Sequence, residues 1–253
     1  MGDLFSNQTE LPWLNSYEKS WKKITQNNKT PHAILISGNR GIGKRAFAAW
    51  LATEHLDITT KYKGCIYPFA VPSHADLKWI RPNEGKRDIS VDQIRQIIDD
   101  LSMSSYEGIG KVAVIEPVNK MNISSANSLL KILEEPPGNT LIILIADKMK
   151  NIPATIISRC QHIKIYPPTE DESREFINHI HPDANIGKID PYILLSPLIY
   201  EEQNNHSQNI ESIINDLMSM LNKKNSPLDI AARLSVEEAE IFLDWFSYFV
   251  YSL

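Results

Sequence analysis

The chain has 253 residues, of which 42% are hydrophobic and 23% charged, so it can bury a sizeable core as a globular protein, and it contains no apolar run long enough to cross a membrane. The net charge is −5, and from Ile186 onward four Lys or Arg stand against ten Asp or Glu, which makes the last third a poor surface for DNA. The two cysteines, Cys65 and Cys160, are too few and too far apart for a disulfide framework or a four-cysteine zinc site, and with an N-terminus that lacks a secretory signal they predict a cytoplasmic protein without zinc.

The first predicted elements are a helix and a strand–loop–helix unit. The segment Ser16–Gln26 predicts a helix that ends at the asparagines 27 and 28. An apolar run, Ala33–Ile36, is followed by a glycine-rich turn and by a second apolar run, Ala46–Leu51. This order is typical of a buried strand, a tight loop and a helix.

The glycine-rich turn matches the phosphate-binding loop of nucleotide-binding proteins. Gly38, Gly43 and Lys44 fit the spacing G-x-x-x-x-G-K, and Gly41 lies inside the same loop. Such glycines let backbone N–H groups surround phosphate oxygens at the positive end of the next helix, and the lysine reaches the outer phosphates. The following residue, normally a magnesium-binding Ser or Thr, is Arg45. The loop can therefore hold ATP or ADP but lacks a metal ligand, and a tight turn that binds nothing is the alternative.

The middle of the chain alternates strands with helices. Residues His55–Pro72 are irregular and predict a loop, and Asp76–Ile80 predicts a short strand. The segment 89–105 predicts a helix, in which Ser90 and Gln93 have the spacing of a capping box.

A second set of elements continues this alternation. Lys111–Pro117 predicts a strand that carries a carboxylate, Glu116, at its C-terminal end, where ligands bind in open α/β sheets. The helix that follows is expected to be capped by Ser125 and stopped by Pro136. The continuous apolar run Leu141–Ala146 is typical of a strand buried on both faces.

The α/β pattern ends with a short helix near Arg159 and a strand over His162–Tyr166. The alternation predicts a parallel sheet that is covered on both sides by helices. No strand is predicted after Pro168, where Thr169 and Glu172 have the spacing of another capping box and open a helix. We therefore divide the chain into an α/β module (1–167) and two helical parts (168–205 and 206–253).

Several motifs in this order resemble those of bacterial clamp-loader subunits of the AAA+ class. They are PHAILISGNRGIGK, HADLKWIRPNEG, ISVDQIRQI, KVAVIEPVNKMNISSANSLLKILEEPP and IPATIISRCQ. The resemblance covers about residues 11–168 well, and the combination of NSLLKILEEPP with SRC is specific to the family. It implies an AAA+ P-loop module, a small helical lid and a helical collar that joins a five-membered ring. The resemblance further implies that relatives continue with more collar helices, so we expect the collar of this chain, 206–253, either to be reduced or to be completed by a partner.

The resemblance also implies a role for Ser158, Arg159 and Cys160, which form the Ser-Arg-Cys motif. In such rings the arginine points at ATP bound by the neighbouring subunit and acts as an arginine finger in trans. A guanidinium there stabilises the charge that develops on the transferring phosphoryl group. A surface salt bridge is the alternative interpretation of Arg159.

Three departures from the family pattern favour a subunit that does not hydrolyse ATP itself. Arg45 replaces the magnesium ligand, Pro117 stands beside Glu116 where ATPase subunits have an Asp-Glu pair, and the region around Asp147 lacks the usual hydroxyl or amide. The clamp-loader stator is normally such a subunit, whereas the motor subunit hydrolyses ATP. The prediction is a stator without a resident metal or zinc.

The resemblance implies the partners as well: the motor and delta subunits of the loader, and through the complex the sliding clamp and primed DNA. An active P-loop ATPase, such as the motor subunit of the same loader, is the main alternative. A free-standing P-loop kinase is a weaker one, because the Ser-Arg-Cys motif and the helical parts do not fit it. The residue at position 45 distinguishes stator from motor.

Overall fold

The computed structural model describes residues 8–26, 30–58, 63–184, 189 and 191–200, together with the single residues 219, 226, 228 and 243. The chain divides into two compact units, Met1–Pro168 and Thr169–Leu253. Among the described residues, no helix is both long and apolar enough to cross a membrane. The predicted boundary between residues 205 and 206 lies outside the described residues, as does the predicted collar apart from four isolated positions.

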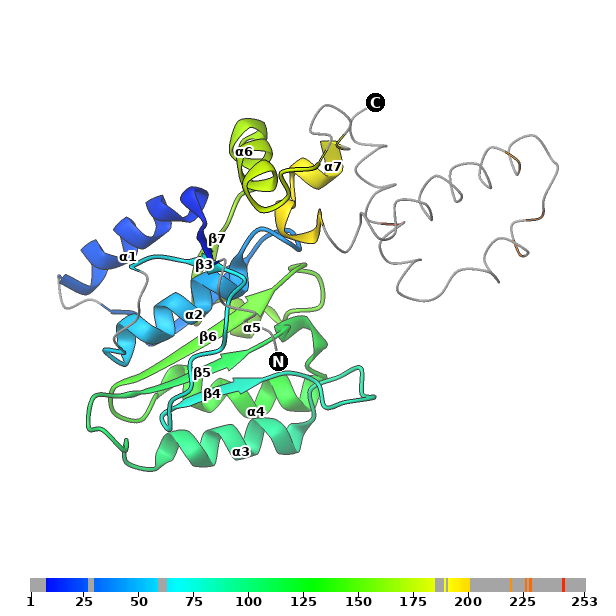
Figure 1. The fold of residues 1–253 in the computed structure, drawn as a ribbon. Coiled ribbons are helices and arrows are strands. Elements are labelled where there is room, and N and C mark those ends of the chain that lie inside the picture. The colour runs from blue at the N-terminus through cyan, green and yellow to red at the C-terminus, as the bar shows by residue number, and fades with distance from the viewer. Residues whose placement is uncertain are drawn as a thin grey trace. The chain divides into compact units, whose positions relative to one another are not determined.

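The first unit is built on a five-stranded parallel sheet (Figure 1). Its strands run in the spatial order β4 (Leu77–Ile80), β5 (Lys111–Ile115), β6 (Thr140–Ala146), β2 (Ala33–Ser37) and β7 (Gln161–Lys164). Every residue of β2, β5 and β6 is buried, because these three strands are central and covered on both faces. The predicted parallel α/β sheet is confirmed, including all five of its strands.

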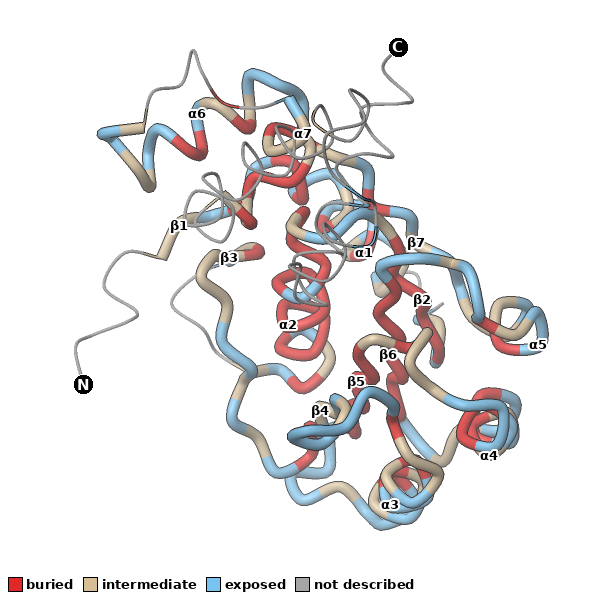
Figure 2. Tube along the Cα trace, turned by 90° about the vertical axis from the view of Figure 1, so that its right-hand side faces the viewer, coloured by how far each residue is buried: buried red, intermediate tan, exposed pale blue. Residues whose placement is uncertain are grey.

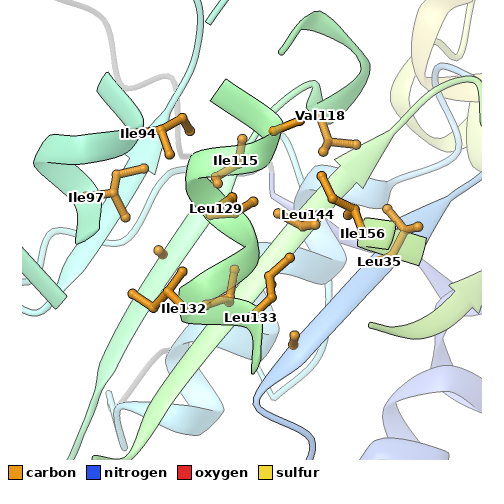
Figure 3. Packing of buried hydrophobic residues seen from close by; sticks show 14 of the residues in the cluster. Leu35, Ile94, Ile97, Ile115, Val118, Leu129, Ile132, Leu133, Leu144 and Ile156 are labelled. Carbon is orange, nitrogen blue, oxygen red and sulfur yellow. The ribbon is translucent and has the colours of Figure 1, made fainter. Parts of the chain in front are cut away.

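Helices cover both faces of this sheet (Figures 1 and 2). On one face lies α2 (Lys44–His55), which is buried along most of its length. On the other lie α3 (Val91–Ser102), α4 (Ile123–Glu134) and the short α5 (Ala154–Ile157). Alternate strand residues supply each face, so that Leu35, Ile115 and Leu144 pack against α3 and α4 (Figure 3).

Side chains cap α3 and α4 as simple hydrogen-bonding rules require, with one difference from the prediction. The capping box of Ser90 and Gln93 is confirmed at the start of α3. Helix α4, however, begins earlier than predicted, because Asn122 caps it by accepting from the backbone N–H of Ser125. The prediction of Ser125 as the cap was wrong: its buried hydroxyl donates to the Ile89 carbonyl instead.

The N-terminal segment adds a short antiparallel pair that the sequence pattern did not predict. Strand β1 (Thr9–Glu10) pairs with β3 (Ile66–Tyr67), which lies inside the stretch expected to be a loop. A 3-10 helix, Pro12–Leu14, then leads into α1 (Asn15–Gln26), the first predicted helix. Two residues per strand are too few for a readable alternation of polar and apolar side chains.

The second unit is helical over its described residues. Helix α6 (Glu170–Ile180) begins at a capping box of Thr169 and Glu172, as predicted. A short helix, α7 (Pro191–Leu194), and a 3-10 helix, Pro197–Ile199, follow. The buried Ser173 hydroxyl donates to the Leu194 carbonyl at 2.5 Å and ties α6 to α7.

Candidate functional site

The glycine-rich loop joins β2 to α2 at the C-terminal edge of the sheet, where ligands bind in open α/β folds. A side chain at Gly38 would bring a Cβ to 2.4 Å from the Ile165 carbonyl oxygen, so only glycine fits. Gly43, with a φ of +95°, is the residue immediately before α2. The loop therefore has the backbone of a phosphate-binding loop, and the predicted Gly38, Gly41, Gly43 and Lys44 lie together in it.

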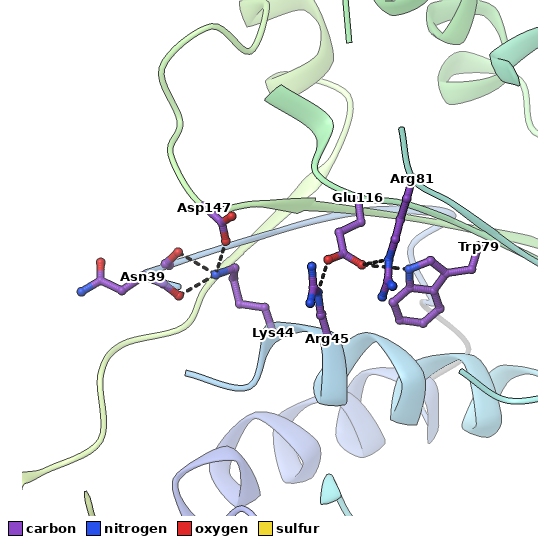
Figure 4. Close-up of polar contacts among 8 residues, drawn as sticks. Asn39, Lys44, Arg45, Trp79, Arg81, Glu116 and Asp147 are labelled. Carbon is purple, nitrogen blue, oxygen red and sulfur yellow. Dashed lines mark hydrogen bonds and ion pairs between the residues drawn. The ribbon is translucent and has the colours of Figure 1, made fainter. Parts of the chain in front are cut away.

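Lys44 is directed into its own loop (Figure 4). Its side chain is 4% exposed, and Nζ donates to the carbonyls of Gly38 at 2.9 Å and Asn39 at 2.5 Å. Nζ also forms an ion pair with Asp147 Oδ1 at 2.7 Å. Burial lowers the pKa of Lys44 from its usual value, and the negative charge of Asp147 opposes that shift. Since an ammonium group has three N–H donors, the protein itself satisfies all of them.

Arg45 points toward the C-terminal end of β5 (Figure 4). Its Nε forms an ion pair with Oε1 of Glu116, which directly follows β5 and is 3% exposed. The other carboxylate oxygen, Oε2, accepts from Trp79 Nε1 at 2.9 Å and from Arg81 Nε at 3.2 Å. The guanidinium of Arg81 also lies over the Trp79 ring, 5.9 Å from its centre. Both oxygens of Glu116 are thus engaged by donors of the protein.

These contacts do not fit a resident magnesium ion. Magnesium takes oxygen ligands, and a P-loop site supplies them from a hydroxyl after the lysine and from a carboxylate at the end of a nearby strand. Here the first position holds the cationic Arg45, and the carboxylate of Glu116 is bound to that same guanidinium. A fixed positive charge therefore lies beside the carboxylate that would otherwise bind the metal.

The Ser-Arg-Cys motif lies at the end of α5. Ser158 is the C-terminal cap of this helix, and the partly buried Cys160 packs against the core under α4. Burial raises the pKa of the Cys160 thiol to about 12, so it is no nucleophile near neutral pH. Arg159, between them, is one-third exposed and forms an ion pair with Glu134, the last residue of α4.

The stretch after α2 contains one of the two cysteines. Cys65 is buried there, and its backbone N–H donates to the Glu18 carboxylate at 2.7 Å. Burial, with the nearby Glu18 charge, raises the pKa of the Cys65 thiol well above its usual value. Cys65 is thus a buried, neutral thiol, and the absence of zinc stays a prediction.

Four residues that matter to these contacts were not predicted as site residues: Trp79, Arg81, Glu134 and Asp147. Arg81 and Asp147 directly follow strands β4 and β6, so the rule that ligands bind at the C-terminal ends of strands could have found them. Glu134 is the last residue of α4, and its pairing with Arg159 depends on how α4 and α5 pack. No signal in the sequence identified Trp79.

A family of protein domains described as "DNA polymerase III, delta subunit" matches residues 13–169 of this chain. Subunit delta' of DNA polymerase III from Pseudomonas aeruginosa is 28% identical over 93% of this chain and 74% of that protein. The delta' subunit from Haemophilus influenzae is 30% identical over 66% of this chain and 52% of that protein. The chain therefore spans about half the length of some of its relatives.

Relatives with a different subunit name are also similar to this chain. Subunit gamma of DNA polymerase III from Buchnera aphidicola subsp. Schizaphis graminum is 33% identical over 60% of this chain and 43% of that protein. Among solved structures, the RuvB Holliday junction branch migration motor of Thermotoga maritima has a TM-score of 0.53 at 13% identity, covering 89% of this chain and 68% of that one. The latter likeness concerns the fold alone.

Proposed function

Because the chain belongs to the family described as DNA polymerase III, delta subunit, we propose that it is the stator of a replicative clamp loader. In this role it assembles with the motor and delta subunits into a ring that places the sliding clamp on primed DNA. It supplies Arg159 to the ATP site of a neighbour and does not hydrolyse ATP at its own P-loop. The delta' names of its relatives support the assignment to this subunit.

One observation carries the proposal that the chain's own P-loop is inactive. The cation that would lie between a P-loop and the end of a nearby strand in an ATPase is replaced here by the Arg45 guanidinium, which is bound to Glu116 after β5. Glu116 then cannot orient or activate a water molecule, because both of its oxygens accept from Arg45, Arg81 or Trp79. Lys44 is likewise engaged, and a phosphate would have to displace Asp147 or a loop carbonyl to reach it.

The proposed contribution of Arg159 is electrostatic. A guanidinium presents a planar fork of N–H donors that matches phosphate oxygens, and it keeps its charge at any physiological pH. When it approaches a neighbour's γ-phosphate, it stabilises the charge that develops during hydrolysis. Because the arginine belongs to a different subunit from the P-loop it serves, hydrolysis becomes dependent on closure of the ring.

The motor subunit of the same loader is the second candidate, since relatives named gamma and tau are 30–34% identical to this chain over 56–67% of its length. The Arg45–Glu116 pair argues against it, because a motor needs a magnesium ligand after the P-loop lysine. We therefore prefer the stator.

The purified chain should hydrolyse ATP in the presence of magnesium no faster than its Lys44→Ala variant. Circular dichroism would verify that the variant is folded, since Lys44 also holds the loop together. A steady, magnesium-dependent turnover that disappears in the variant would refute the stator proposal and favour the motor.

A reconstituted loader tests the trans-acting role. The chain, or its Arg159→Ala variant, is combined with the motor and delta subunits of the same organism, and size-exclusion chromatography verifies that both rings assemble. An arginine finger contributes about 10³- to 10⁵-fold to kcat in GTPases, so the one ATP site beside this subunit should be nearly silent in the variant. Clamp- and DNA-stimulated ATPase of the whole ring should fall in part, and Arg159→Lys should not restore it fully. Parent-like clamp loading by an assembled Arg159→Ala ring would disprove the role.

A further inference from the structure

Arg159 does not extend freely from the surface but is held at three points by its own chain. Its Nε donates to Glu134 Oε1 at 2.6 Å, and Nη2 pairs with the same oxygen. Its Nη1 donates to the Thr155 carbonyl at 2.9 Å. The Glu134 carboxylate thus accepts hydrogen bonds from one edge of the guanidinium, and the Thr155 carbonyl accepts one from the other terminal nitrogen.

The three contacts do not use all the N–H donors of the Arg159 guanidinium. A guanidinium has five N–H bonds: one on Nε and two on each terminal nitrogen. The three contacts use one bond on each nitrogen. Within the part of the chain that the structure describes, one N–H on Nη1 and one on Nη2 remain without a partner. Two N–H bonds on adjacent terminal nitrogens form a fork that can donate to two oxygens of one phosphate.

Both ends of this contact are fixed by buried neighbours. Glu134 follows Ile132 and Leu133, which are 4% and 1% exposed in the core, and the Leu133 carbonyl accepts from His32 Nε2 at 2.8 Å. On the other side, the backbone N–H of Arg159 donates to the carbonyl of the fully buried Ile156. The carboxylate and the arginine therefore project from two anchored helix ends, so the pair is well placed to hold one orientation.

We propose that Glu134 is the positioning residue of the arginine finger. It holds one edge of the Arg159 guanidinium and directs the remaining fork outward, toward a phosphate on a neighbouring subunit. The proposal rests on the function proposed above and adds a residue to it. Glu134 touches no substrate in this scheme and acts only through Arg159.

The opposite role would be a restraint, in which Glu134 keeps the arginine away from the phosphate until the ring closes. The donor count favours positioning, since a fork of two N–H bonds stays available while all three contacts are intact. A carboxylate held on one edge also reduces the rotamer freedom that a long arginine side chain would otherwise lose when it binds a phosphate. Positioning and restraint predict opposite changes in rate when Glu134 is removed.

The test uses the reconstituted loader with four forms of this chain: parent, Glu134→Ala, Glu134→Gln and the matched control Glu135→Ala. Glu135 is the adjacent exposed carboxylate, and it has no ion pair among the residues described here. Because the contact is a partly exposed ion pair, Glu134→Ala should slow hydrolysis at the one ATP site beside this subunit about two- to fivefold. The kcat of DNA-stimulated ATP hydrolysis by the whole ring should therefore fall measurably but by less than in Arg159→Ala, with KM for ATP unchanged. Glu134→Gln keeps an acceptor oxygen for both Nε and Nη2 and should retain most of the parent rate. Glu135→Ala should behave as the parent.

A double variant separates positioning from a general loss of structure. If Glu134 acts only through the arginine, Arg159→Ala/Glu134→Ala should be no slower than Arg159→Ala alone. Parent-like or faster hydrolysis by Glu134→Ala, or an additive effect in the double variant, would overturn the positioning role. If Arg159→Ala itself leaves the rate unchanged, the proposed function fails first; if it lowers the rate and Glu134→Ala does not, only the positioning role fails.

Discussion

The shared carboxylate of Glu116 leads to a stability prediction that two single substitutions cannot reveal. Glu116 is 3% exposed, whereas the two arginines that bind it, Arg45 and Arg81, are 53% and 44% exposed. If either arginine is replaced by alanine, the other arginine and Trp79 still compensate the buried charge. Each single substitution should therefore cost about 1 kcal/mol, the usual limit for a partly exposed ion pair.

The double variant Arg45→Ala/Arg81→Ala leaves the buried carboxylate with Trp79 alone. Removing the partners of a buried charge costs about 3–5 kcal/mol, because the charge stays desolvated without compensation. The double variant should thus lose about 1–3 kcal/mol more than the sum of the single variants, within the range measured for coupled neighbours. Adding Glu116→Gln to the double variant removes the charge and should recover part of the loss.

Urea unfolding followed by far-ultraviolet circular dichroism would measure all five proteins under the same conditions. The informative quantity is the coupling between positions 45 and 81, since errors common to the series cancel in it. Additive losses, or a triple variant no more stable than the double, would show that Glu116 does not depend on the two arginines for its charge compensation.

Three further predictions follow from the buried ionisable groups. Since a pKa of about 12 leaves roughly 10⁻⁴ of the Cys160 thiol ionised at pH 8, iodoacetamide should modify native protein far more slowly than urea-unfolded protein, and equal rates would contradict this burial. The pKa of Lys44 is lowered in the folded protein, so just below pH 10.5 the unfolded chain binds more protons than the folded one. The free energy of unfolding of the parent should therefore rise relative to that of Lys44→Met as the pH increases through this range. A stability difference that does not change with pH would contradict the lowered pKa. Elemental analysis of the purified protein should find no zinc, because the described residues contain no group of three or more His, Cys, Asp or Glu side chains that could hold a metal ion. Stoichiometric zinc would disprove this prediction.

Local pattern was sufficient for most elements of the first unit. The central strands are continuous apolar runs, and the flanking helices α3 and α4 have side-chain caps within one turn of sequence, so these elements depend on neighbours in the chain. The start of α4 was predicted wrongly because Asn122 and Ser125 are both good caps, and the choice depended on the buried Ile89 carbonyl, which binds the Ser125 hydroxyl.

The sequence by itself determined that the chain has a glycine-rich loop with the spacing of a phosphate-binding loop, an arginine in place of the metal ligand, and a motif with an arginine at its centre. The partners of Lys44 and Arg45 were decided only by the order of the strands, and the partner of Arg159 by the packing of α4 against α5. In the parallel register Ser37 lies beside Ala146, and Ile80 beside Ile115. The next residues, Gly38 with Asp147 and Arg81 with Glu116, therefore leave the sheet side by side, although they are about 110 and 35 positions apart in the chain. Local periodicity does not indicate which strands pair with one another, because strand order depends on the packing of the whole core.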